Sequence, residues 1–209
     1  MDSASLGLPD VSRETTERLK SFADAVAHWT RSINLISERT TDEIWARHIL
    51  DSLQVMALAP KNAMSWCDLG SGAGFPGLVA AIVNLEDNPT CVHTLIESDK
   101  RKSAFLALQS KALALNARII AGRIESTPPA HADVITARAL APLPKLLAYA
   151  SRHGSERATY IFPKGRGAQT EIAEARAEFD FDAVCHPSKT DPQGAVVVIA
   201  NLMPRRARA

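Results

Sequence analysis

From residue 64 onward, short apolar runs alternate with longer stretches of helical periodicity, and this alternation constrains the fold more than any other feature. Runs typical of strands fall near 64–69, 91–97, 118–121, 132–137, 158–163, 179–186 and 194–202. Helical patterns fall near 76–86, 99–115, 141–152 and 168–177. The alternation predicts an α/β fold with a mostly parallel sheet and right-handed crossovers. The last two runs are joined by a linker that contains Pro, Asp and Gly. They predict a closing hairpin, which makes a seven-stranded sheet with an antiparallel last strand.

The residues before this region have the pattern of helices. One apolar face is predicted from positions spaced by three and four, which are Leu19, Phe22, Val26, Trp29 and Ile33. A second helix is expected to begin near Thr40, which has capping-box spacing to Glu43. Its buried stripe would be Trp45, Ile49, Leu53 and Met56. We therefore expect an N-terminal helical extension over 1–62 and a second domain over 63–209, packed together as one globular unit.

Composition and charge limit the possible partners. The formal net charge of +1 argues against a protein that binds polyanions over its whole surface. The three cysteines, Cys67, Cys91 and Cys185, lack metal-ligand spacing, so reduced thiols and no metal site are expected. The segment 1–9 lacks a signal-peptide pattern, and the apolar runs are too short to span a bilayer. We expect a cytoplasmic protein without a membrane partner.

A glycine-rich loop follows the first predicted strand. Glycines occupy positions 70, 72, 74 and 77, and a helix is expected to follow from Pro76. Glycines at such a turn let a ligand approach the backbone closely, and a purely structural turn is the weaker alternative. Gly72, Gly74 and Gly77 also match the dinucleotide fingerprint. Two features favour S-adenosylmethionine over NAD: the early position of Gly70, and Asp68, whose carboxylate could face a methionine ammonium but would repel a pyrophosphate.

Two further positions extend the expected nucleotide site. Glu97 ends the next strand, where a carboxylate can accept hydrogen bonds from two ribose hydroxyls. An ordinary solvated acid at a strand end is the alternative. Ile124 and Glu125 follow the third strand, where an apolar side chain beside a backbone amide would suit an adenine ring.

Basic residues cluster at the predicted ligand edge of the sheet. Arg123, Arg138 and Lys164 each lie just past the end of a strand, and a rim of this kind attracts phosphates. They are therefore candidates for positioning RNA. The run 100–102 is as consistent with a solvated helix face, and the arginines near the C-terminus are better explained by a disordered end.

Arg47, His48 and Asp51 have helical spacing, and two interpretations of them stay open. Asp51 lies three positions after His48 and four after Arg47, so it could pair with either along the helix. The three could equally form a polar cluster that closes over the cofactor site. The sequence shows no nucleophile elbow and no metal-binding pair.

Taken together, these motifs resemble one known family, the bacterial small-subunit ribosomal RNA guanine-N7 methyltransferases, also called the glucose-inhibited division protein B family. The resemblance covers nearly the whole chain. Its segments are Trp29 with Asn34-Leu35, Arg47 through Ser52, Asp68 through Gly77, Glu97 through Lys102, Arg123 through Glu125, Arg138-Ala139 and Pro163 through Gly165. The Arg-His-x-x-Asp-Ser helix before a glycine loop with Phe-Pro-Gly is specific in combination.

The resemblance implies a Rossmann-like class I S-adenosylmethionine-dependent methyltransferase. It implies that the cofactor contacts are Gly70, Phe75, Ile124, Glu125 and Arg138. It also implies that the substrate is one guanine of the 530 loop of 16S rRNA in the small ribosomal subunit, and we expect a monomer. One departure is Ala137, where the family often has serine, so a hydroxyl contact from that position is lost.

The expected reaction needs little acid–base chemistry. Guanine N7 has an in-plane lone pair and no proton, so its methylation needs no general base, which agrees with the lack of a catalytic dyad. The rival functions are an NAD-dependent oxidoreductase, a non-catalytic ribosome-binding protein with a methyltransferase fold, and an S-adenosylmethionine enzyme acting on small molecules or proteins.

Overall fold

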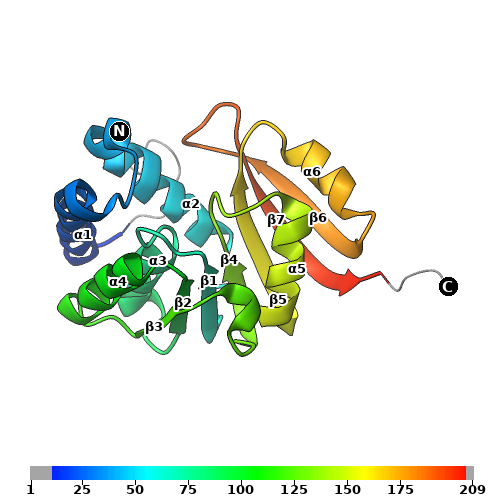
Figure 1. The fold of residues 1–209 in the computed structure, drawn as a ribbon, viewed down its shortest axis with the longest axis horizontal. Coiled ribbons are helices and arrows are strands. Elements are labelled where there is room, and N and C mark those ends of the chain that lie inside the picture. Colours follow the sequence, from blue (N-terminus) through cyan, green and yellow to red (C-terminus); the bar gives the residue numbers. More distant parts are fainter. Residues whose placement is uncertain (1–10, 206–209) are drawn as a thin grey trace.

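The computed structural model describes residues 11–205, without the side chains of residues 38, 39 and 42. A seven-stranded sheet forms its centre, with the order β3-β2-β1-β4-β5-β7-β6 (Figure 1). The strands are β1 (Ser65–Leu69), β2 (Val92–Glu97), β3 (Ala117–Ala121), β4 (Ala132–Thr136), β5 (Gly154–Lys164), β6 (Phe179–Pro187) and β7 (Ala195–Pro204). Strands β1 to β5 pair in parallel, and β7 runs antiparallel to both β5 and β6. The predicted mixed sheet with a closing hairpin is therefore confirmed.

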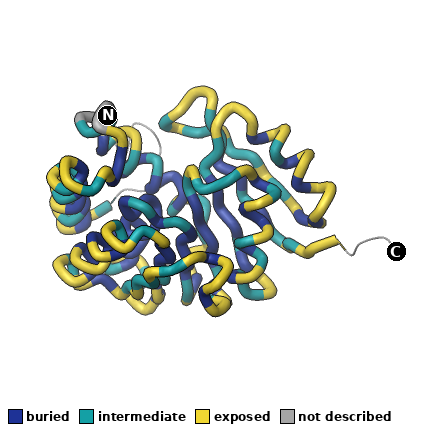
Figure 2. Tube along the Cα trace, viewed as in Figure 1, coloured by how far each residue is buried: buried dark blue, intermediate teal, exposed yellow. Residues whose placement is uncertain are grey.

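Helices cover both faces of this sheet. They are α1 (Arg13–Ile33), α2 (Leu50–Leu58), α3 (Gly77–Asp87), α4 (Lys100–Ala112), α5 (Leu143–His153) and α6 (Ala168–Ala175). Alternate strand residues face opposite layers, so Cys67 and Leu69 pack with α5 and α6, whereas Trp66 and Leu95 pack with the N-terminal helices and α3. Figure 2 shows the central strands as deeply buried, whereas the edge strands β3 and β6 are partly exposed. No helix in residues 11–205 has both the length and the apolar composition to cross a membrane.

The N-terminal segment is helical, as predicted, but less regular at its second helix. In α1, Leu19, Phe22 and Val26 are buried. The chain then forms a 3₁₀ turn (Glu38–Glu43) and a π turn (Trp45–Ile49) before α2. The predicted capping box is wrong, because the Thr40 hydroxyl donates to the Ser37 carbonyl at 2.8 Å instead of capping a helix. The C-terminal arginines 206 and 208 lie outside the described residues.

The junction between β1 and α3 depends on the buried Asp68. Its side chain is 1% exposed, and its Oδ1 accepts a hydrogen bond from the Thr136 hydroxyl at 2.7 Å. Its Oδ2 has no hydrogen-bond partner among the described residues and lies against Gly77 at the start of α3. Burial raises the pKa of Asp68 from 3.8 to about 6, although Thr136, Ser71 and the Gly77 amide oppose this shift.

Gly77 leaves no room for a side chain. A Cβ atom there would lie 2.7 Å from Oδ2 of Asp68 and 2.8 Å from its Cβ. We expect Gly77→Ala to destabilise the fold by about 1–3 kcal/mol, because a buried carboxylate and a helix must shift apart. Chemical denaturation measures this loss. Gly165→Ala is the control, since a Cβ there meets no atom within 4 Å; equal stabilities of the two variants would contradict the prediction.

Asp68 also predicts a pH dependence of stability. Because its pKa is raised from 3.8 to about 6 in the folded state, the folded protein holds this proton more tightly than the unfolded chain. The stabilisation from this group is complete below about pH 4 and is lost as the pH rises through about 6. The free energy of unfolding of the wild type, relative to Asp68→Asn, should fall between about pH 4 and pH 6 in urea titrations. A constant difference over that range would refute it.

Candidate functional site

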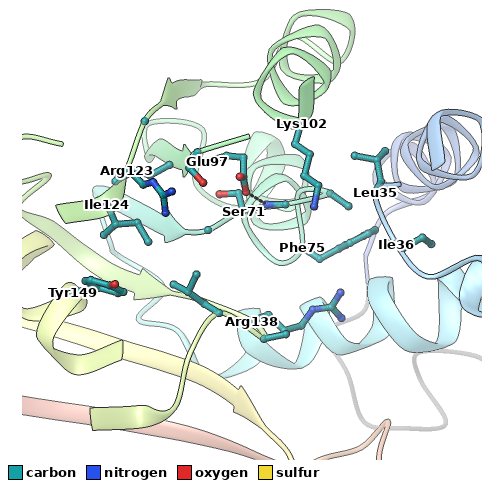
Figure 3. Close-up of a pocket in the computed structure, with 18 of the residues that line it drawn as sticks. Leu35, Ile36, Ser71, Phe75, Glu97, Lys102, Arg123, Ile124, Arg138 and Tyr149 are labelled. Atoms are coloured by element: carbon teal, nitrogen blue, oxygen red, sulfur yellow. Dashed lines mark hydrogen bonds between the residues drawn. The ribbon is translucent and has the colours of Figure 1, made fainter. Parts of the chain in front are cut away.

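A cavity of about 380 Å³ lies at the carboxyl ends of β1, β2 and β4, where open parallel sheets bind ligands (Figure 3). It has the size of a small-molecule site. Its wall includes the glycine loop, the end of β2, the turn after β3 and the segment after β4. The predicted residues that line it are Gly70, Gly72, Phe75, Glu97, Arg123, Ile124, Glu125 and Arg138.

The glycine loop brings backbone into the wall of this cavity. Gly70 and Gly72 have φ angles of 67° and 55°, which side-chain-bearing residues rarely adopt. A Cβ at Gly70 would lie 2.6 Å from Cδ1 of Leu140, so the loop after β4 packs directly on this glycine. Gly72 is open toward the cavity, since a Cβ there would meet only the Gly70 carbonyl at 3.8 Å. The glycines therefore provide both a sharp turn and close backbone access.

Two predicted cofactor residues, Asp68 and Gly74, are not among the residues that line the cavity. Asp68 lies beneath the loop, so its carboxylate supports the β1–α3 junction instead of facing a ligand. Gly74 also lies outside the lining, and a Cβ there would lie 2.9 Å from Leu78 and 3.0 Å from Phe22. Packing against α1 and α3 therefore requires glycine at position 74.

Glu97 is nearly buried, at 8% exposed, and is held by two backbone amides. Its Oε2 accepts from the Gly72 amide and its Oε1 from the Asp99 amide, both at 2.8 Å. A carboxylate has about four acceptor positions, so two remain available to a ligand. The same carboxylate thus fixes the glycine loop and offers acceptors to a polyol.

The turn after β3 provides an apolar wall and a cation. Ile124 begins a short 3₁₀ turn (Ile124–Ser126) and is 7% exposed. Figure 3 shows Ile124 and Arg123 beside the cavity, across from Phe75. No hydrogen bond or ion pair is found for the Arg123 side chain within residues 11–205.

Other lining residues escaped the sequence interpretation. They are Leu35, Ile36, Ser71, Ala73, Ile96, Ser98, Lys102, Gly122, Ala139, Leu140 and Tyr149. Leu35 and Ile36 come from the segment after α1, and Tyr149 comes from α5. Helical periodicity assigns such residues to a core, and no local pattern marks them as cavity walls.

Arg138 joins the sheet to the helix that carries Arg47, His48 and Asp51. Its guanidinium donates to Asp51 Oδ2 and to the Arg47 carbonyl, both at 3.1 Å, and lies 2.6 Å from His48 Nδ1. The His48 ring stacks on Phe75 at a centroid distance of 5.0 Å, and the guanidinium lies 5.4 Å from the same ring. Of the two open interpretations, a polar cluster is the one observed, and Arg138 connects it to the first cavity. Arg47 pairs instead with Glu43, at 3.4 Å.

The cluster also sets the protonation of His48. A guanidinium can only donate, so Nδ1 of His48 accepts and the imidazole is neutral. Burial, followed by the positive charges of Arg138 and Arg47, lowers the pKa of His48 to about 4. His48 is therefore an acceptor that orients Arg138 near neutral pH.

A second, wider cavity of about 690 Å³ adjoins the first and shares Arg138, Ala139 and Leu140 with it. It is lined also by His48, Asp51, Lys164, Glu171 and residues of the β6–β7 loop. Lys164 thus lies at the second cavity, separate from Arg123 at the first, with Arg138 between them. The three basic candidates do not converge on one point.

The β6–β7 loop beside the second cavity is hydrogen-bonded to α2. Gln54, which is 3% exposed, donates to Asp51 at 2.6 Å and accepts from the Lys189 amide at 3.0 Å. The Thr190 hydroxyl donates to Asp51 at 2.9 Å. Asp51 therefore connects Arg138 to the β6–β7 loop. Within residues 11–205, no group of His, Cys, Asp and Glu side chains could hold a metal ion.

Comparison with known proteins agrees with this architecture. The Aquifex aeolicus protein titled a SAM-dependent methyltransferase aligns with a TM-score of 0.57 at 14% identity, covering 76% of this chain and 92% of that one. The M. jannaschii TYW2 structure, titled as a complex with AdoMet, aligns with a TM-score of 0.55 at 14% identity, covering 76% of each chain. At these identities the likeness establishes the fold: α/β, with the Rossmann-like sheet of these methyltransferases.

Sequence comparison is more specific. The GidB family model, described as rRNA small subunit methyltransferase G, matches residues 15–193. The ribosomal RNA small subunit methyltransferase G of Cereibacter sphaeroides is 44% identical over 202 residues, which are 97% of this chain and 98% of that protein. The protein of the same name from Gluconobacter oxydans is 46% identical over 191 residues, 91% of this chain and 96% of that protein. The chain therefore belongs to the GidB family of small-subunit ribosomal RNA methyltransferases.

Proposed function

We propose that the protein is an S-adenosylmethionine-dependent methyltransferase that methylates N7 of one guanine in the 530 loop of 16S rRNA. The observation that carries the proposal is the pair of adjoining cavities, which share the wall formed by residues 138–140. The first has the size and lining of a nucleoside site, and the second is wide enough for a base presented from RNA. Family membership supports the choice of small-subunit rRNA, and it does not favour the oxidoreductase or non-catalytic alternatives.

The first cavity fits the cofactor in the nature of its donors and acceptors. Glu97 retains acceptor positions for ribose hydroxyls, and Ile124 with Glu125 supplies an apolar wall beside backbone for adenine. Gly70, Gly72 and Phe75 also line this cavity, and the methionine portion would lie on the side where Phe75 adjoins Arg138. Asp68 and Gly74 support this loop from beneath.

When bound, S-adenosylmethionine supplies a methyl group on a positively charged sulfur. Guanine N7 can take up this methyl group through its lone pair, and N7 carries no proton that must be removed. The residues of the chain therefore need not remove a proton, and His48 is already occupied as an acceptor of Arg138. These residues instead hold N7 in line with the methyl group and exclude water.

Of the three basic candidates, Arg123 and Arg138 are proposed to position the RNA. Arg123 and Lys102 reach the first cavity with side chains that make no ion pair in the described chain, so they are available to phosphates. Arg138 borders both cavities and can orient the base only through O6 or a phosphate, because N7 must stay free.

The proposal also includes the organisation of the chain. The extension 1–62 and the methyltransferase domain 63–209 are taken to act as one unit, supported by His48 and Asp51 lining the same cavity as Lys164. With 16S rRNA in the small ribosomal subunit as its partner, the enzyme would work in the cytoplasm, as a monomer.

Methyl transfer tests the proposed function directly. The protein is incubated with labelled S-adenosylmethionine and either 16S rRNA or small ribosomal subunits from cells that lack the enzyme. Label should enter the RNA at a single guanine of the 530 loop, as 7-methylguanine, when the product is digested and mapped. Label at another nucleotide, or none in either substrate, would refute the assignment.

Gly72→Val tests the cofactor site. A β-branched side chain at a φ of 55° is strained and would enter the cavity. We expect S-adenosylmethionine affinity to fall more than about tenfold, or 1.4 kcal/mol, in calorimetry. Circular dichroism checks that the variant is folded, and Gly165→Ala, outside the first cavity, should bind as the wild type does. Unchanged affinity in a folded Gly72→Val protein would show that the loop is not part of the cofactor site.

A further inference from the structure

The ammonium group of Lys164 is already used within the protein. Its Nζ donates to Glu171 Oε2 and to the Ala141 carbonyl, both at 2.8 Å, and its side chain is only 9% exposed. Glu171 comes from α6, whereas Ala141 lies between β4 and α5. The ion pair therefore joins the end of β5 to α6, and the hydrogen bond to Ala141 joins it to a segment that borders the second cavity.

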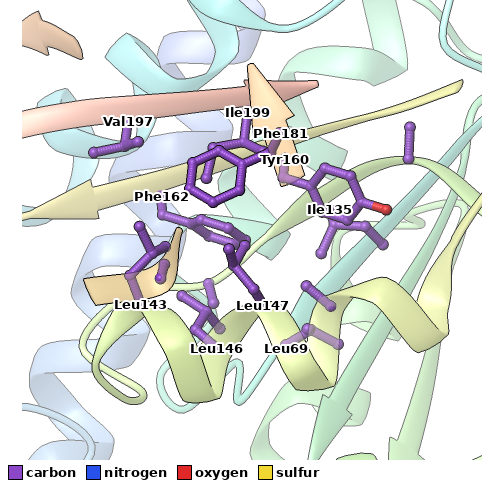
Figure 4. Close-up of a cluster of buried hydrophobic side chains, with 14 of the residues drawn as sticks. Leu69, Ile135, Leu143, Leu146, Leu147, Tyr160, Phe162, Phe181, Val197 and Ile199 are labelled. Atoms are coloured by element: carbon purple, nitrogen blue, oxygen red, sulfur yellow. The ribbon is translucent and has the colours of Figure 1, made fainter. Parts of the chain in front are cut away.

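Glu171 makes a second contact with that segment. The same Oε2 accepts a hydrogen bond from the Leu143 amide at 2.7 Å. Leu143 is the first residue of α5, and Pro142 at the N-cap position provides no side-chain cap. The carboxylate of Glu171 thus satisfies a free amide at a helix N-terminus, where negative charge is favourable. The Leu143 side chain is fixed in the apolar cluster shown in Figure 4.

The segment held in this way forms the wall between the two cavities. Ala139 has a φ of 53°, a conformation that is unfavourable for an L-residue and persists only when its surroundings enforce it. Leu140 packs on Gly70, so the position of the wall also bears on the glycine loop. A displacement of residues 141–143 would therefore change the shape of both cavities.

The contacts of Lys164 argue against a role as a phosphate ligand. A carboxylate 2.8 Å from the ammonium cancels much of its attraction for a second anion. Removing Glu171 would leave the Lys164 ammonium, whose side chain is only 9% exposed, without its charge partner.

We propose that Lys164 and Glu171 are positioning residues that clamp residues 139–143, and that they control the rate of methyl transfer through this wall without contacting the RNA. The proposal rests on the proposed function for its activity measurements. It adds Glu171 to the residues on which the reaction depends, and it revises the expected role of Lys164.

Kinetics of Lys164→Ala, Glu171→Ala and the double variant test the clamp. Each single variant should lower kcat at saturating RNA by about tenfold to a hundredfold, because small displacements near the reacting atoms are costly. The double variant should lose no more than the worse single one, since both changes release the same wall. Glu171→Gln, which can still accept from the Leu143 amide, should recover part of the rate. Assays are run below the melting temperature of each variant.

RNA binding separates the clamp from a phosphate contact. With the clamp, RNA affinity and its dependence on salt stay unchanged in both single variants. If Lys164 contacts a phosphate, Lys164→Ala should weaken binding and flatten the slope of log K against log salt by about 0.7. Glu171→Ala should then bind RNA as well as the wild type or better. That second pattern would overturn the proposal. Lys61→Ala and Glu174→Ala, both exposed residues outside the two cavities, are the matched charge controls.

Hydrogen exchange provides a readout that does not require activity. The Leu143 amide should exchange faster in Glu171→Ala and Lys164→Ala than in the wild type, and in Glu174→Ala it should not change. Unchanged exchange at Leu143 in both clamp variants would overturn the proposal. If instead the wild type transfers no methyl group to RNA, the proposed function fails, while exchange at this amide still decides whether the clamp exists.

Discussion

The reversal of strand order between β1 and β4 is the constraint on which both cavities depend. These strands are neighbours in the sheet, but α3 and α5, which follow them, pack on opposite faces. The connections that leave their carboxyl ends must therefore separate, and the space between them becomes a crevice. The glycine loop lines one side of it and the segment 138–142 the other. Leu140 on Gly70 is the point at which the two sides touch.

Arg138 stands at the end of β4 and connects this crevice to the N-terminal helices. Its partners Asp51 and His48 hold it in place. Asp51 also accepts hydrogen bonds from Gln54 and from Thr190 of the β6–β7 loop. One chain of polar contacts thus links the cofactor cavity, the second cavity and the loop that closes it. The partners of Arg138 fix its position, whereas the Arg123 side chain is unpaired within residues 11–205 and remains available to a polyanion.

Much of this could be predicted from the sequence because the signals were local. A glycine pattern after an apolar run marks a turn at a strand end, and Glu97 is recognisable from its position at the next strand end. Asp68, Gly74 and Lys164 could not be placed in the same way. Whether Asp68 faces a ligand or lies beneath the loop depends on the direction of its side chain relative to α3. The ion pair of Lys164 depends on α6 lying beside the segment after β4.

The sequence by itself determined the α/β alternation, the closing hairpin, the glycine turn and the family, since periodicity and motif spacing are properties of neighbouring positions. The tertiary structure alone decided that Arg47, His48 and Asp51 form a cluster with Arg138, 87 to 91 positions away along the chain. It also decided which cations are engaged by carboxylates and which are open. Such pairings arise from packing between distant elements, and no local pattern encodes the distance between two atoms that meet only when the sheet and its helices have assembled.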